Sequence, residues 1–187
     1  MHISPRDMGW IEVIVGPMFS GKTEELIKRL RRAMYARQTV RVFKPRIDNR
    51  FSENEIVSRN QMKLESITVT NPHEILPLSE DCDVVGIDEV QFFSMEIVSV
   101  ADQLAHQGKR VIVAGLDLDF MAQPFESVAN LLCIAEYITK TLAICVVCGN
   151  PASRSQRLVA GGTDRIVVGD VQAYEARCRK CFHPVPV

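Results

Sequence analysis

The chain has 187 residues, enough for one full hydrophobic core and a small appendage, and its 47% hydrophobic and 24% charged residues are typical of a globular protein. No apolar run approaches the roughly 18 residues that cross a bilayer, and residues 1–8 lack the apolar centre of a secretory signal, so we expect a cytoplasmic protein with reduced cysteines. A net charge of −1 offers no basic field to a nucleic-acid backbone, which favours a small-molecule substrate over DNA or RNA.

The first predicted element is a strand over residues 10–15, and a glycine-framed loop follows it directly. The loop fits the phosphate-binding pattern GxxxxGK[ST] in full. It consists of Gly16, Pro17, Met18, Phe19, Ser20, Gly21, Lys22 and Thr23. Its backbone N–H groups can surround phosphate oxygens, Lys22 can reach the terminal phosphates, and the Thr23 hydroxyl can contact Mg²⁺. The position between a strand and a helix favours nucleoside-triphosphate binding over the alternative, an ordinary strand–turn–helix corner.

Strands and helices alternate after this loop. Further strands are expected at residues 39–43, 66–70, 82–87, 110–115 and 137–142. Helices are expected at residues 24–37, 72–76, 94–107 and 127–135. Asn71 and Ser94 are the expected N-caps of the second and third helices, and the polar stretch 44–61 is expected to form a long loop. This alternation predicts an α/β fold, with a parallel sheet covered by helices on both faces.

Six cysteines are unevenly placed along the chain. Cys82 and Cys133 are isolated in apolar sequence and are expected in the core, whereas the other four form two CxxC hooks separated by 29 residues. The hooks are Cys145, Cys148, Cys178 and Cys181. Each hook can bring two thiolates to one tetrahedral, structural Zn²⁺. The alternatives are a redox dithiol, unrelated buried cysteines, or His183 in place of Cys181 as the fourth ligand.

The character of the sequence changes near residue 142. We expect a nucleotide-binding domain over residues 1–142 and a small zinc-binding domain over residues 143–187. Between the hooks, residues 153–169 are predicted as a long loop whose ends the metal would pin. Loops of this length are uncommon unless they cover a site.

An acidic pair follows the predicted strand at 82–87. Asp88 can hold Mg²⁺ directly or through water, as expected of an acid at the carboxyl end of a strand beside a phosphate loop. Glu89 can orient a nucleophile, which is water in an ATPase and a substrate hydroxyl in a small-molecule kinase. The remaining alternative is an exposed acidic pair that only caps the strand.

Several segments, taken in order, resemble the type II thymidine kinases, the family found in bacteria and in animal cytosol. They are GPMFSGKT at 16–23, GIDEVQFF at 86–93, VIVAGLD at 111–117 with Phe120 and PF at 124–125, and the two CxxC hooks. The resemblance extends from about residue 10 to 181. It implies a P-loop (RecA-like) fold with a small C-terminal zinc-binding lasso domain.

The resemblance also implies roles for individual residues. Glu89 would be the general base for the 5′-hydroxyl of thymidine, and Lys22, Thr23 and Asp88 would handle ATP and Mg²⁺. The other residues implied for the ATP and magnesium site are Asp48, Asn49, Arg50 and Gln91. Arg50, taken alone, reads as a solvated loop arginine. The residues implied for the nucleoside site are Met18, Phe92, Leu116, Phe120, Ser155, Arg157, Arg165, Ile166, Val167, Val168, Gly169 and Tyr174. Residues 165–169 would read the base through their backbone.

The implied reaction is transfer of the γ-phosphoryl group of ATP to thymidine, and to deoxyuridine, giving the monophosphate and ADP in pyrimidine deoxynucleotide salvage. The family also implies a homotetramer and feedback inhibition by dTTP. Two departures from the family pattern are Val90, where a small residue is usual, and Asp170, where a second glycine is common. The rival functions are a P-loop nucleotide hydrolase and a zinc-containing, nucleic-acid-binding ATPase.

Overall fold

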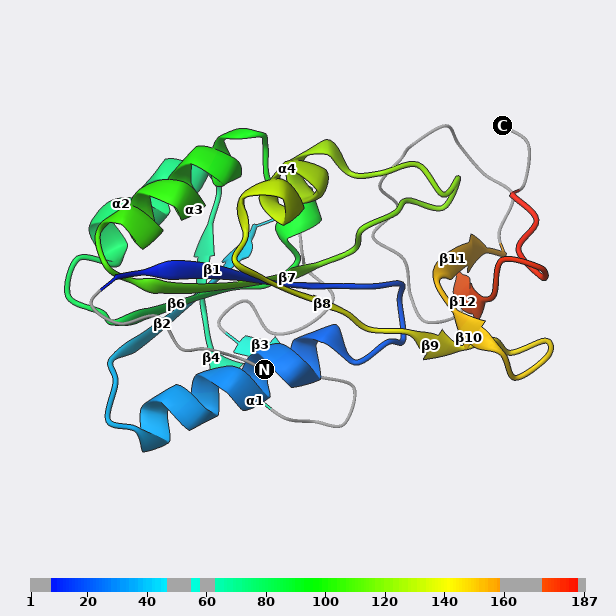
Figure 1. The fold of residues 1–187 in the computed structure, drawn as a ribbon, viewed down its shortest axis with the longest axis horizontal. Coiled ribbons are helices and arrows are strands. Elements are labelled where there is room, and N and C mark those ends of the chain that lie inside the picture. The colour runs from blue at the N-terminus through cyan, green and yellow to red at the C-terminus, as the bar shows by residue number, and fades with distance from the viewer. Residues whose placement is uncertain (1–7, 47–54, 58–62, 159–172, 185–187) are drawn as a thin grey trace.

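The structure is a computed structural model that describes residues 8–46, 55–57, 63–158 and 173–184. Its centre is a six-stranded sheet in the order β5–β2–β6–β7–β1–β8, in which every pairing is parallel (Figure 1). The strands are β1 (Trp10–Val15), β2 (Val40–Pro45), β5 (Ile67–Val69), β6 (Val84–Ile87), β7 (Arg110–Gly115) and β8 (Tyr137–Lys140). The predicted parallel sheet is therefore confirmed.

Helices cover both faces of this sheet, as predicted. α1 (Lys22–Tyr35) lies on one face, and α2 (Ile75–Leu78), α3 (Glu96–His106) and α4 (Glu126–Ile134) lie on the other (Figure 1). Two short 3-10 turns, η1 (Pro72–Glu74) and η2 (Val90–Phe92), complete this part of the fold. Across the ranges that the structure describes, none of these helices is long and apolar enough to cross a membrane.

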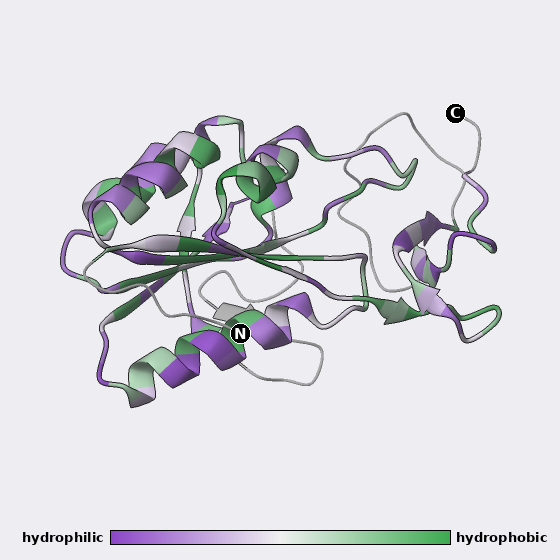
Figure 2. Cartoon of the chain, in the orientation of Figure 1, coloured by the Kyte–Doolittle hydropathy of each residue, from purple (hydrophilic) through white to green (hydrophobic). Residues whose placement is uncertain are grey.

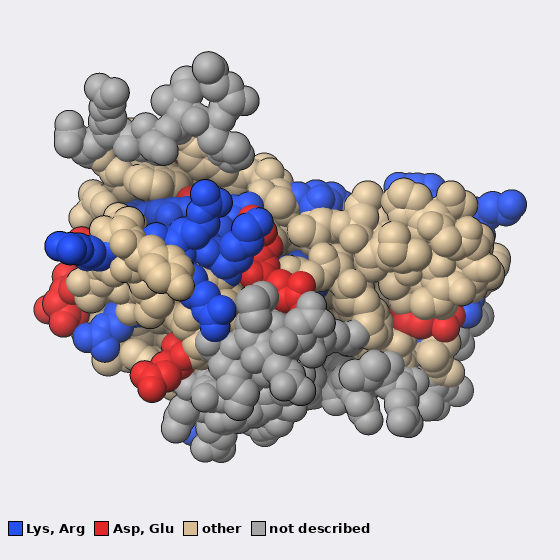
Figure 3. All heavy atoms as spheres, turned by 90° about the horizontal axis from the view of Figure 1, so that it is seen from below, with Lys and Arg blue, Asp and Glu red and all other residues tan. Residues whose placement is uncertain are grey.

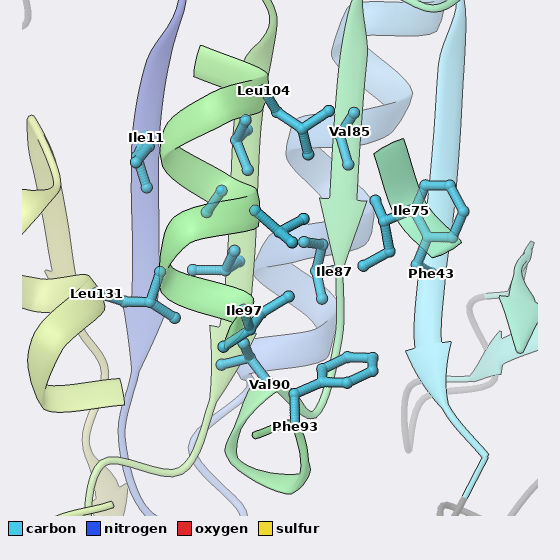
Figure 4. Close-up of a cluster of buried hydrophobic side chains, with 14 of the residues drawn as sticks. Ile11, Phe43, Ile75, Val85, Ile87, Val90, Phe93, Ile97, Leu104 and Leu131 are labelled. Atoms are coloured by element: carbon cyan, nitrogen blue, oxygen red, sulfur yellow. The ribbon is translucent and has the colours of Figure 1, made fainter. Parts of the chain in front are cut away.

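The core has two layers because the central strands are buried on both sides. The larger cluster lies between the sheet and α3, where Ile87, Val90, Phe93 and Ile97 meet (Figure 4). The smaller cluster joins Ile14 to the apolar stripe of α1. Figure 2 shows the same arrangement, with hydrophobic strands between helices that are hydrophilic on their outer sides. Strands that are apolar on both sides, joined by amphipathic helices, are what a covered parallel sheet requires.

Asn71 caps η1 as predicted, since its side chain accepts from the backbone of His73 and Glu74 completes the capping box. Ser94 is not the N-cap of α3. Its hydroxyl donates to the Glu96 carboxylate, and the helix begins after Met95 with no side-chain cap. The prediction was wrong because the short side chain forms a local hydrogen bond with another side chain instead of a backbone N–H.

Cys82 is buried, as predicted, but Cys133 is exposed. The apolar stripe of α4 runs through Val128 and Leu131, which are fully buried. Cys133 lies two residues after Leu131, and residues two apart in a helix face opposite sides. The apolar residues next to Cys133 in the sequence therefore did not show which face of α4 is buried.

The expected loop at 44–61 also contains regular structure. β3 (Glu55–Val57) pairs antiparallel with β4 (Lys63–Glu65), outside the central sheet. Leu64 packs against the cluster under α1. A three-residue strand is too short to give a periodic pattern, so the sequence offered no signal for this pairing.

The net charge of −1 is unevenly distributed over the surface. Figure 3 views the molecule from the side of α1, where Lys and Arg side chains gather. Lys28, Arg31 and Arg32 are exposed on this helix, while its first turn carries Glu24 and Glu25. Acidic residues at the start and basic residues at the end of a helix complement its dipole.

A buried carboxylate attaches α1 to the sheet. Glu12, in the middle of β1, is only 7% exposed. It accepts hydrogen bonds from Arg29 of α1 (2.9 Å), from Arg110 of β7 (2.6 Å) and from the Trp10 indole (2.9 Å). Arg29 continues to Glu25 and to Thr139 of β8. One helix and three strands are thus joined by a single hydrogen-bonded charge network.

Replacement of Glu12 by glutamine removes the charge that faces Arg29 and Arg110 while keeping the shape of the side chain. Because hydrogen bonds to charged groups contribute about 2 kcal/mol each, we expect the free energy of unfolding in urea at pH 7 to fall by about that amount. Glu25→Gln is the control, since it removes only a partly exposed partner of the same arginine. Its cost should stay below about 1 kcal/mol.

The effect of Glu12 should depend on pH. Burial alone would raise the pKa of Glu12, but hydrogen bonds from Arg110 and Trp10 and the charges of Arg110 and Arg29 outweigh it and lower the pKa below its ordinary 4.5. A lowered pKa in the folded state gives stability that is present above pH 4.5 and lost as the pH falls through the folded value. The wild type and the Glu12→Gln variant should therefore converge in acid, and an undiminished difference there would contradict this account.

Candidate active site

The phosphate loop leaves the carboxyl end of β1 and is braced by the residue that follows β8. Gly16 has φ 155°, and a Cβ at this position would lie 2.3 Å from the carbonyl oxygen of Thr141. The Thr141 backbone N–H donates to Val15 (2.8 Å), and its hydroxyl donates to Ser20 (2.9 Å). Glycine is required at position 16 because Thr141, the residue after β8, passes directly against the loop. No motif in the sequence marks Thr141 as part of the site.

The loop is also attached to the C-terminal part of the chain. The Met18 backbone N–H donates to the Ser155 hydroxyl (3.0 Å), and Phe19 packs against the small apolar cluster that contains Cys145 and Cys178. Phe19 has φ 69°, which is uncommon for a residue with a side chain. Ser155 and Met18, both predicted site residues, are therefore in direct contact across 137 positions of the sequence.

The structure brings together the two predicted magnesium-site side chains. The Thr23 hydroxyl lies 3.1 Å from one oxygen of Asp88, which is buried at the end of β6. Hydroxyl and carboxylate oxygens are the ligands that Mg²⁺ prefers, so this pair fits the ion. The Lys22 ammonium donates to the carbonyl of Pro17 (2.8 Å), which places its charge over the loop.

Glu89 occupies an unusual backbone conformation beside this pair. It has φ 52° and ψ 40°, in the left-handed region, and its backbone N–H donates to Asp88 (3.0 Å). Such conformations cost free energy and concentrate at functional sites. The next residue, Val90, is fully buried, and its side chain packs in the core with Phe93 and Ile97 (Figure 4). The extra methyl groups of Val90 are thus accommodated by the core cluster.

The segment between β7 and α4 forms a turn that presents Phe120. The buried Asp119 carboxylate accepts from the backbone of Met121 (2.9 Å) and Gln123 (2.8 Å), and thereby closes the turn. The Arg157 guanidinium stacks over the Phe120 ring, 4.6 Å from its centroid. Phe120 and Arg157 come from distant parts of the chain, so this segment and the C-terminal part meet at the ring.

Residues predicted for the nucleoside site converge on an antiparallel ribbon. β11 (Arg154–Arg157) pairs with β12 (Tyr174–Arg177), so that Ser155 lies opposite Ala176 and Arg157 lies opposite Tyr174. The predicted loop at 153–169 therefore begins with a strand. Its polar sequence concealed this, because the pairing depends on β12 and not on local apolar alternation. A second ribbon, β9 (Ala143–Ile144) with β10 (Pro151–Ala152), carries the first CxxC hook.

The four hook cysteines form one cluster. Their Sγ atoms all lie within 4.8 Å of one another, and no histidine or carboxylate of the described ranges joins them. A tetrahedral metal with bonds of about 2.3 Å to sulfur needs sulfur atoms about 3.8 Å apart, and Cys148 lies 3.6 Å from Cys178 and 3.5 Å from Cys181. The cluster fits a structural metal with Cys181, not His183, as the fourth ligand.

The thiols influence one another strongly. Burial opposes ionisation of Cys145, but backbone hydrogen bonds from Cys178, Val147 and Cys148 lower its pKa to about 6. Hydrogen bonding to Cys148, followed by burial, raises the pKa of Cys181 to about 12. Four neighbouring thiolates repel one another, and a bound cation would remove that repulsion.

Some predicted site residues lie outside the described ranges. They are Asp48, Asn49, Arg50, Arg165, Ile166, Val167, Val168 and Gly169. Asp170, the second departure from the family pattern, lies outside them as well.

Nearly the whole chain is similar to proteins of one known family. A family model described as thymidine kinase matches residues 9–182. A curated protein named thymidine kinase, from Rhodothermus sp. (strain ITI 518), is 56% identical over 177 residues, which cover 95% of this chain and 83% of that protein. Among solved structures, domain III of the Thermotoga maritima replication initiation protein DnaA gives a TM-score of 0.43 at 13% identity, over 70% of this chain and 54% of that one.

Proposed function

Because this chain belongs to the thymidine kinase family, we propose that it transfers the γ-phosphoryl group of ATP to the 5′-hydroxyl of thymidine, and of deoxyuridine, in cytoplasmic deoxynucleotide salvage. Family membership makes it an ATP-dependent kinase. The observation that best supports the specific reaction is the corner formed by Asp88 and Glu89. It places an acid against Thr23 of the phosphate loop and a second acid one residue further on.

In the proposed reaction a bond forms between the γ-phosphorus and the 5′-oxygen of the nucleoside. The bond from that phosphorus to the oxygen bridging the β-phosphate breaks, and ADP leaves. The Glu89 carboxylate takes the proton of the 5′-hydroxyl. Phosphoryl transfer requires little covalent chemistry from the protein. Most of the rate enhancement should therefore come from the positioning of the substrates and from charge stabilisation by the loop and Lys22.

Thr23 and Asp88 would hold Mg²⁺, with Asp48, Asn49 and Arg50 contributing to the same ATP site. The ion, when bound, neutralises phosphate charge and orients the terminal phosphates. Gly16 and its constrained neighbours supply the backbone N–H groups around the phosphates.

The acceptor nucleoside would occupy an apolar pocket formed by Met18, Phe92, Leu116 and Phe120. Flat aromatic and aliphatic walls suit a pyrimidine ring, which stacks and makes few polar demands on them. Ser155 and Tyr174 would contribute polar contacts, and the backbone of residues 165–169 would read the edge of the base.

The proposal is tested by assaying phosphorylation of thymidine with ATP. We expect the wild type to form thymidine monophosphate, and the Glu89→Gln variant to lose about 100-fold or more of kcat while still binding thymidine, since general-base catalysis contributes about that much. Glu80→Gln is the control, because Glu80 is exposed in the turn before β6. Near-normal turnover by Glu89→Gln would show that Glu89 is not the general base. Hydrolysis of ATP by the wild type without a nucleoside would instead favour a nucleotide hydrolase.

We also propose that the cysteine cluster binds structural Zn²⁺, and that residues 143–187 form a zinc-binding domain attached to a nucleotide-binding domain over residues 1–142. Four sulfur ligands leave no position open for substrate or water. The metal would therefore hold the two hooks together and take no part in phosphoryl transfer.

Elemental analysis of protein purified without added metal should find about one zinc per chain. Cys145→Ser should release the metal and lower the melting temperature by about 5 °C or more, because the metal stabilises only the folded state. Cys133→Ser is the matched control, since this cysteine is exposed on α4 and is not in the cluster. The assignment would be refuted if the purified wild type contained no zinc, or if removal of its zinc by a chelator left the melting temperature unchanged.

We further propose that the chain forms homotetramers and is inhibited by dTTP. dTTP contains a thymidine, which the nucleoside pocket would bind, and a triphosphate, which the phosphate loop would bind. For assembly, β8 is an edge strand that pairs only with β1 in the described sheet. Ile138 on this strand, Leu142 just after it and Ile144 in β9 are at least half exposed. An apolar edge of this kind favours pairing with a second copy across a twofold axis.

Light scattering after gel filtration should give the mass of a tetramer for the wild type. Ile138→Lys should reduce it to dimers, because a charge on the exposed side of an edge strand opposes pairing with another edge. Leu78→Lys, at an exposed apolar position on α2, should leave the mass unchanged. A monomeric wild type, or an Ile138→Lys variant that remains a tetramer, would contradict this interface.

A further inference from the structure

Gln91 is a buried polar side chain within the corner that carries the two acids. It lies in η2, only 4% exposed, two residues after Glu89. The family resemblance groups it with the ATP and magnesium residues, but its contacts in this structure lead elsewhere. We propose that Gln91 is a positioning residue that fixes the Glu89 carboxylate relative to the nucleoside-pocket segment beginning at Leu116. This inference rests on the proposed role of Glu89 as the base.

Both ends of the Gln91 amide are engaged. Its Nε2 donates to Oε2 of Glu89 at 2.5 Å, and its Oε1 accepts from the backbone N–H of Leu116 at 3.0 Å. The orientation of the amide is determined by its partners. The Leu116 N–H can only donate, so Oε1 must face it, and Nε2 is then the atom that faces the carboxylate. An ionised carboxylate can only accept, so the contact favours the charged form that a base requires.

The space for this bridge depends on the glycine at the end of β7. A Cβ on Gly115 would lie 2.6 Å from Oε1 of Gln91 and 2.7 Å from Cγ1 of Val90. Val90 is fully buried in the core and cannot yield easily. The amide oxygen of Gln91 and the Val90 side chain thus both lie where a side chain at position 115 would stand, so the bridge needs glycine there.

Glu89 is fixed from two directions by these contacts. Its backbone is in the left-handed region and donates to Asp88, which in turn contacts Thr23 of the phosphate loop. Its carboxylate is held by Gln91, which ends on the segment of the nucleoside pocket. Catalytic groups must be held closely in geometry, because small displacements at the reacting atoms cost large factors in rate.

Two substitutions at position 91 separate this role from simple support of the Leu116 segment. Gln91→Met keeps the approximate shape and removes both hydrogen bonds. Gln91→Glu keeps an acceptor for the Leu116 N–H but replaces the donor to Glu89 by a second carboxylate, which repels the Glu89 carboxylate or shares a proton with it. If Gln91 acts through Glu89, both variants should lose about 30-fold in kcat, a fraction of what a general base contributes, while KM for ATP and thymidine changes less than about threefold.

Gln123→Met is the control, because the side chain of this glutamine is exposed and its hydrogen bond to Asp119 comes from its backbone N–H, which the substitution keeps. It should retain wild-type kcat. The Glu89→Gln variant provides a second comparison. Adding Gln91→Met to Glu89→Gln should cost nothing further, since residues that act as a unit are non-additive.

The inference is overturned if Gln91→Glu keeps wild-type kcat while Gln91→Met raises KM for thymidine, because Gln91 would then support only the pocket segment. It is also overturned if the losses from Glu89→Gln and Gln91→Met multiply. Should Gln91→Met fail to fold, Gln91→Glu and its double variant with Glu89→Gln decide the matter. Failure of the proposed function looks different, since Glu89→Gln would then remain active or the wild type would not phosphorylate thymidine.

Discussion

The close contact between the phosphate loop and Thr141 is the constraint on which the rest of the site depends. Gly16 has no side chain because the carbonyl of Thr141 occupies that space, and Thr141 in turn bonds to Val15 and Ser20. Thr141 directly follows the edge strand β8 and precedes the cysteine hooks. The same contact therefore shapes the loop that would cradle phosphate and sets where the C-terminal ribbons leave the sheet.

The parallel sheet explains why the chemical groups meet. β1, β6 and β7 end at the same edge, and each is followed at once by a functional segment: the phosphate loop, the pair Asp88 and Glu89, and the turn that carries Phe120. The sequence predicts the phosphate loop and the acidic pair because each is a local pattern, an apolar strand followed by glycine or acid, whereas the role of Phe120 is implied only by the family resemblance. The CxxC hooks are predicted for the same reason, since two thiols at close spacing have few other uses in a reduced protein.

The missed features are contacts between distant positions. The hydrogen bond from Met18 to Ser155, the stacking of Arg157 on Phe120 and the bridge from Gln91 to Leu116 depend on how loops approach one another, which no local pattern encodes. The errors on Ser94 and Cys133 have the same origin. Composition described their surroundings along the chain, whereas their actual environment is set by where each helix begins and which face it turns to the sheet.

The distant contacts also connect the metal cluster to the phosphate loop. Val146, between the first two cysteines, donates its N–H to Ala176 of β12, and Ala176 lies opposite Ser155 in the ribbon. Ser155 accepts from the Met18 backbone, within the loop itself. A metal that holds the hooks together would thus stabilise, through one strand pair and two hydrogen bonds, the backbone that surrounds the phosphates. A structural ion remote from the reacting atoms can in this way influence how well the loop is preorganised for catalysis.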